Sequence, residues 1–105
     1  MTRNEKIAEK MGWIIVNGSF HDGRDWRNPQ TNVADAHLLI ERMVGDGWNV
    51  RIYFFRNGTC GAHAVFPHSL NFDTHESINH LTEGHLDAPT AVVELFCRVY
   101  GIKED

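Results

Sequence analysis

The feature of the sequence that most limits its fold is the dipeptide Asn57-Gly58, which lies between two strand-like runs, 48–55 and 59–66. Asparagine and glycine both tolerate positive φ, so the dipeptide predicts a tight β-hairpin. A two-residue turn at this point places Ile52 opposite His63. In that register one face carries Trp48, Val50, Ile52, Phe54, His63 and Val65, and the other carries Arg51, Tyr53, Phe55, Cys60, Ala62, Ala64 and Phe66. Because both faces hold large apolar side chains, and each would forfeit about 1.5–3 kcal/mol in water, we expect helices to cover both.

The remaining elements are marked by caps and turns. A capping box at Thr2 and Glu5 opens a helix that ends at Gly12, and Asn17-Gly18 predicts a hairpin between 13–16 and 19–21. A second helix starts at a cap on Asn32 or Thr31 and ends at 45–47, and a third runs from Asp87 to Gly101. This order predicts an α+β fold in which an antiparallel sheet built from two hairpins is covered by three helices, as an α/β/α sandwich.

Length and composition predict one domain spanning residues 1–105. The chain has an ordinary hydrophobic share of 42% and a net charge of −4, with its lysines and arginines scattered, so direct nucleic-acid binding is not expected. The two cysteines, Cys60 and Cys97, read as buried free thiols because they lack a CxxC spacing. The polar start of the chain and the absence of any long apolar run predict a cytoplasmic protein without a membrane span.

Residues 67–86 show little hydrophobic periodicity and carry four of the seven histidines, which predicts a long His-rich loop with a short helix around His75 to Leu81. His75 and Glu76 followed by His80 resemble a zinc HExxH motif, but the histidines lie five residues apart, which separates their rings by about 140° on a helix. No metal and no cofactor is therefore predicted. A zinc site completed by His85 or His68 stays an alternative, and so does a solvated loop that is rich in histidine by chance.

The polar loop 22–29 presents Trp26 between Arg24 and Arg27. These residue types are enriched at binding hot spots and can stack on bases, so we predict surface recognition here; the alternative is that Trp26 folds back onto the core. No Walker or dinucleotide loop is present, and no catalytic residues are predicted. His37 and His63 are expected to face the core as neutral histidines, since nothing in the spacing requires that they join Cys97 in a nucleophilic cluster.

Three segments carry a resemblance to a known family: IAEKMGW near the start, ADAHLLIERMVGDGW in the middle and LDAPTAVVELFCRVYGI at the end. Together with the loop that contains Trp26 and the aromatic hairpin, they resemble the phage ABA sandwich domain, a family of small phage and prophage proteins. The resemblance implies a sheet between helical layers, and it implies no general activity or catalytic residue set. The His-rich segment from His68 to His85 departs from the family pattern.

These observations favour a non-enzymatic phage accessory protein that binds and inhibits or modulates a host protein, for example a defence component such as a CRISPR nuclease. The predicted partner-binding residues are Arg24, Trp26, Arg27, His75, Glu76, His80 and His85. Two alternatives remain: a protein that sequesters a nucleotide-like signal through Trp26 and the two arginines, and a zinc-binding protein that uses the His-rich loop. A homodimer is favoured if an aromatic sheet face is exposed because the third helix packs elsewhere.

Overall fold

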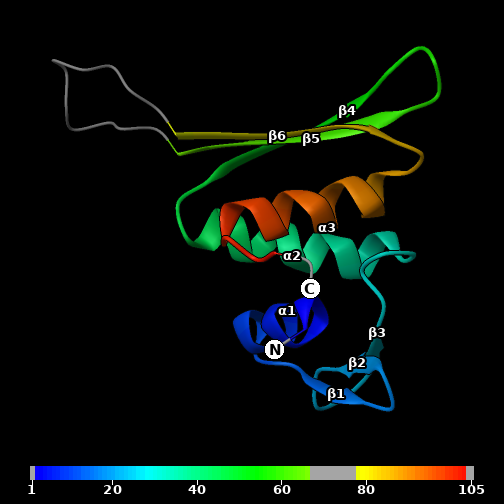
Figure 1. The fold of residues 1–105 in the computed structure, drawn as a ribbon, viewed down its shortest axis with the longest axis vertical. Coiled ribbons are helices and arrows are strands. Elements are labelled where there is room, and N and C mark those ends of the chain that lie inside the picture. Colours follow the sequence, from blue (N-terminus) through cyan, green and yellow to red (C-terminus); the bar gives the residue numbers. More distant parts are fainter. Residues whose placement is uncertain (1, 67–77, 104–105) are drawn as a thin grey trace, which may run out of the picture.

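The structure is a computed structural model that describes residues 2–66 and 78–103. It contains three helices and two antiparallel sheets, so the predicted α+β class is confirmed (Figure 1). In chain order the elements are α1 (Arg3–Met11), β1 (Ile14–Val16), β2 (Ser19–His21), β3 (Trp26–Arg27), α2 (Val33–Gly45), β4 (Asn49–Phe54), β5 (Cys60–Phe66), β6 (Ile78–His85) and α3 (Ala88–Val99).

Each helix begins at the cap that the sequence predicts. The side chain of Thr2 accepts a hydrogen bond from the Glu5 amide, that of Asn32 from the Asp35 amide, and that of Asp87 from the Thr90 amide. These bonds satisfy backbone donors that the first turn of a helix cannot pair internally. The three helix starts are therefore decided by interactions within three residues.

The layering of helices and sheet is compatible with the predicted sandwich, but the predicted single sheet is divided in two. The two hairpins lie in separate sheets, β1-β2-β3 and β4-β5-β6. All three helices lie on one side of β4–β6: α3 and α2 pack directly on it, followed by α1 and then the small sheet (Figure 1). The hydrophobic core extends from the large sheet through the helices to Phe20 of the small sheet, and its largest members include Leu39, Met43, Leu95 and Phe96. Helices thus form the middle layer between two sheets.

The large hairpin forms at Asn57-Gly58, but its loop is one residue longer than predicted. Phe55 donates its amide to the Thr59 carbonyl, and Gly58 adopts φ 84°, so the loop is 56–58. Ile52 consequently lies opposite Ala62, and His63 lies opposite Arg51. Because a shift of one residue turns every β5 side chain to the opposite face, the predicted pairing of faces was wrong. The small alanines face the helices, and His63 faces away.

The segment predicted as a His-rich loop over 67–86 is a strand in its second half. Ile78–His85 forms β6 and pairs with β5, so the predicted helix is wrong for residues 78–81. Residues 67–77 lie outside the described part of the chain. The β6 ladder carries a bulge between Cys60 and Ala62, where Gly84 adopts φ 77°.

In the described ranges, no helix combines the length and the apolar character that crossing a membrane requires.

Candidate functional site

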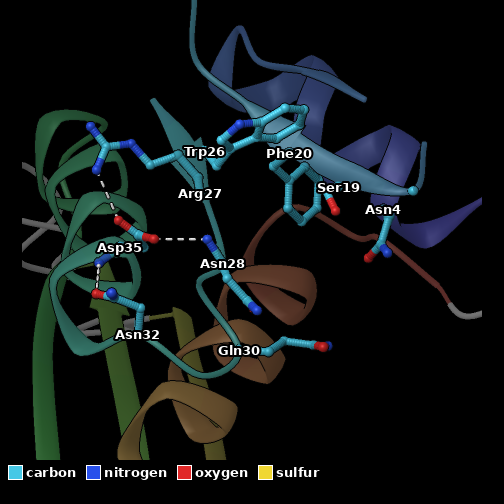
Figure 2. Close-up of a pocket in the computed structure, with 10 residues that line it drawn as sticks. Asn4, Ser19, Phe20, Trp26, Arg27, Asn28, Gln30, Asn32 and Asp35 are labelled. Carbon is cyan, nitrogen blue, oxygen red and sulfur yellow. Dashed lines mark hydrogen bonds and ion pairs between the residues drawn. The ribbon is translucent and has the colours of Figure 1, made fainter. Parts of the chain in front are cut away.

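A pocket of about 460 Å³ opens between the small sheet, the start of α1 and the loop that enters α2 (Figure 2). Two aromatic rings line it: Phe20, which is buried on β2, and Trp26 on β3. The other lining side chains are polar: Asn4, Ser19, Arg27, Asn28, Gln30, Asn32 and Asp35. Carboxamides both donate and accept hydrogen bonds, so the pocket offers mixed polar contacts beside an aromatic surface.

Arg27 braces the strand that forms one side of this pocket. Its Nε lies 2.7 Å from Asp22 Oδ2 and its Nη1 lies 2.9 Å from Asp35 Oδ1, while Nη2 is 3.7 Å from Asp25 Oδ2. Asp35, buried in the first turn of α2, also accepts the Asn28 amide at 2.7 Å. Arg27 therefore joins the small sheet to α2 through charge-assisted hydrogen bonds.

The turn before β3 is ordered by Asp22. Its carboxylate accepts the amides of Asp25 and Arg24 and then the guanidinium of Arg27, and together these bonds hold its pKa far below the ordinary range. The bond to Asp22, followed by that to Asp35, raises the pKa of Arg27. Asp22 and Arg27 are therefore both charged at neutral pH.

Trp26 points away from the core, so the alternative in which it folds back is wrong. Its side chain is 59% exposed and meets the His21 ring edge-on, with ring centroids 4.9 Å apart. Arg24 is also exposed, and no partner for its guanidinium is found among the described residues. Of the three predicted loop residues, Trp26 and Arg24 are thus available for contacts, while Arg27 has a structural role.

The predicted histidine residues do not gather at this pocket. His80 lies on β6 beside Trp48, with ring centroids 5.4 Å apart, and His85 lies opposite Cys60 on the large sheet. His75 and Glu76 fall outside the described residues. Within 2–66 and 78–103, no three metal-ligating side chains come together.

The three residues considered as a nucleophilic cluster lie apart. His37 is exposed on α2, where it contacts Glu41 at 3.5 Å, so the prediction that it faces the core is wrong. His63 lies on the face of β5 opposite to the buried Ala62 and Ala64, because side chains alternate along a strand. Cys97 is buried on α3, as predicted, with its Sγ 3.2 Å from Arg3 Nε.

Sequence reasoning missed Asp35 and the carboxamides that line the pocket. Asn4, Asn28 and Gln30 come from segments whose only local signals are a helix start and a turn. Asp35 lies three positions after the Asn32 cap, where acidic residues are common because they stabilise the start of a helix. Its position therefore gives no sign of a role in a pocket. No family model, curated protein or solved structure matches the chain. The resemblance to the phage ABA sandwich domain therefore stays a prediction.

Proposed function

We propose that this protein is a non-enzymatic binding protein that recognises a segment of a partner protein at the Trp26 pocket. The observation that carries the proposal is the exposure of Trp26 on a braced strand at the edge of a polar pocket. Tryptophan supplies large contact area and is enriched among residues that dominate binding energy. An exposed tryptophan that stabilises no core is best explained by a partner that covers it.

The brace around Arg27 favours tight recognition. Three carboxylates hold Arg27, and the same Asp22 side chain orders the turn that precedes Trp26. A side chain already held in place loses less conformational freedom on binding than one on a mobile loop. We therefore expect Trp26 to bind its partner without rearrangement of the small sheet.

The charges and the polar lining of the pocket favour a peptide over a phosphate. Arg27 is compensated by Asp22, Asp25 and Asp35, so its charge is not available to an anion. The carboxamides of Asn4, Asn28 and Gln30 match peptide groups, which also carry one donor and one acceptor. The nucleotide-sequestering alternative assigns phosphate contacts to Arg24 and Arg27, and of these two only Arg24 has a guanidinium without a partner among the described residues.

The proposed partner is a protein of a bacterial host, in keeping with the resemblance to the phage family. In this proposal the chain blocks or redirects its target, for example a defence component such as a CRISPR nuclease.

The proposal is tested by comparing purifications from bacterial lysate with wild-type protein, Trp26→Ala and Phe54→Ala as bait. Phe54 is a matched control because it is also an exposed aromatic, at 75%, and lies on the large sheet. We expect a partner that is recovered by wild type and by Phe54→Ala and lost with Trp26→Ala. A partner retained by Trp26→Ala contradicts the assignment of the site. Unchanged phage sensitivity of cells that express the protein counts against a defence component as target.

A further inference from the structure

The large sheet has an outer face that no described helix covers. The helices contact its inner face, where Ala62, Ala64 and Thr82 are buried and the Thr82 hydroxyl donates to the Ala91 carbonyl of α3. The outer face carries Arg51 and Tyr53 on β4, His63 and Val65 on β5, and Leu81 and Glu83 on β6, with Phe55 just beyond β4. It is therefore a mixed apolar and charged surface.

The apolar side chains of this outer face are exposed to solvent, which favours contact with a partner. Leu81 is 42% exposed and Phe55 is 40% exposed, and the rings of Tyr53 and Phe55 stack with centroids 6.3 Å apart. Phe55 leans over Gly61, since a Cβ on that residue would lie 3.2 Å from the Phe55 ring. Two adjacent rings and a leucine on an open sheet mark an interaction surface rather than isolated exposed residues.

We infer that this outer face pairs with the same face of a second copy, forming a homodimer. Arg51 and Glu83 lie on the two edge strands and make no ion pair with any described residue. In an isologous interface each of these charges meets its opposite, so that two equivalent ion pairs form. The face is thus complementary to itself in charge.

One orientation of the two copies satisfies both charges. Arg51, His63 and Leu81 form one row across the sheet. A two-fold axis that lies parallel to the sheet and runs along this row, perpendicular to the strands, places Arg51 opposite Arg51 of the second copy. The two like charges then repel each other. An axis parallel to β5 places β4 of one copy over β6 of the other at the same height along the strands, so that Arg51 covers Leu81 and Tyr53 lies over Glu83. The long Arg51 side chain then reaches the Glu83 carboxylate two residues along β6. Aligned packing of two sheets in this way is a common architecture.

The size of the face implies a weak dimer. Three strands that lie about 4.8 Å apart and are about 20 Å long cover a flat area of roughly 300 Å². Because the side chains make this surface uneven, the accessible area buried on each copy would be about 400–500 Å². The total of about 800–1,000 Å² lies below the usual size of stable interfaces, so we expect a dimer that forms only at high concentration.

Sedimentation velocity over about 1 µM to 1 mM tests the inference, since this range covers weak association. Wild-type protein is expected to shift from monomer to dimer across it. Arg51→Glu and Glu83→Arg each place like charges at both contacts, and should raise the dissociation constant at least about ten-fold. Arg56→Glu is the matched control, because it makes the same charge change at the exposed hairpin loop and should leave association unchanged.

The decisive sample is an equimolar mixture of Arg51→Glu and Glu83→Arg. Each variant alone repels itself, but in the mixed dimer both contacts join opposite charges, so dimerisation should return. Far-UV circular dichroism of each variant establishes that it is folded. A wild-type protein that stays monomeric at all concentrations overturns the inference and leaves the face to a different partner. A wild-type dimer with no recovery in the mixture also overturns it, because the copies then meet elsewhere.

Discussion

Arg27 and Asp35 form an ion pair, with Nη1 2.9 Å from Oδ1, that joins the small sheet to the first turn of α2. Asp35 is buried and also accepts the Asn28 amide, so a single carboxylate holds both sides of the junction. Arg27, Asn28 and Asp35 also line the pocket beside Trp26, so this junction forms part of the pocket wall (Figure 2). The brace and the pocket therefore share the residues Arg27 and Asp35.

Removal of this carboxylate should destabilise the protein. Asp35→Ala leaves the Asn28 amide and one side of Arg27 without an acceptor, so we expect a loss of about 2–3 kcal/mol in the free energy of unfolding. Urea denaturation at neutral pH measures it. Glu41→Ala on the exposed side of α2 is the control and should change stability by less than about 0.5 kcal/mol. Equal stability of Asp35→Ala and wild type would contradict the proposed role of the junction.

Asp22 should make stability depend on pH in the acid range. Its folded pKa lies below the ordinary 3.8 because the Asp25 and Arg24 amides and Arg27 bind the charged form. A depressed folded pKa adds stability that is present above the unfolded value and is lost as pH falls from about 4 towards the folded pKa. We expect Asp22→Asn to lose less stability than wild type between neutral pH and acid, as measured by urea midpoints. Identical acid profiles for the two proteins would refute this.

Tyr100 should titrate at unusually high pH. Partial burial, followed by the hydrogen bond from its hydroxyl to Asp46 Oδ2 at 2.5 Å, raises its pKa to about 12. The raised pKa means that its stabilising contribution is full below the unfolded value of 10 and is lost as pH rises through 10–12. In Tyr53→Phe, Tyr100 is the one tyrosine left, so the ultraviolet absorbance of tyrosinate should rise with a midpoint near 12. Asp46→Ala should lower that midpoint, and a midpoint at the ordinary value in Tyr53→Phe would disprove the contact.

Gly61 should not tolerate a side chain. A Cβ at this position would lie 2.6 Å from the Thr82 carbonyl oxygen, in the backbone of β6 beside the bulge. Since the backbone must move, Gly61→Ala should cost about 1–3 kcal/mol. Gly45→Ala is the control, because a Cβ there meets nothing within 4 Å and alanine favours a helix by about 0.5 kcal/mol. Thermal unfolding should shift in opposite directions for the two variants, and a neutral Gly61→Ala would contradict the close approach of β5 and β6.

The elements that could be predicted are those decided by neighbouring residues. The caps at Thr2, Asn32 and Asp87 are hydrogen bonds across three residues, and the turn at Asn17-Gly18 needs only positive φ at both positions. For Trp26 the sequence left exposure and packing onto the core as alternatives, and the structure shows exposure. For the caps and the turn, the deciding interaction lies within one segment of the chain.

What the sequence did not reveal depends on contacts between distant segments. One added loop residue at 56–58 moved the register of the large hairpin and turned His63 outward, which no local preference decides. The strand 78–85 has weak periodicity and becomes a strand because β5 offers it an edge to pair with.

The sequence by itself determined where the helices begin and which dipeptides form turns. The tertiary structure alone decided which sheet face the helices cover and that Arg27 meets Asp35 in the wall of the pocket. The physical reason is the distance along the chain between the interacting residues. Helix caps and turns form their hydrogen bonds within a few residues. Layers, strand registers and ion pairs between residues eight or more positions apart depend on how the whole chain packs.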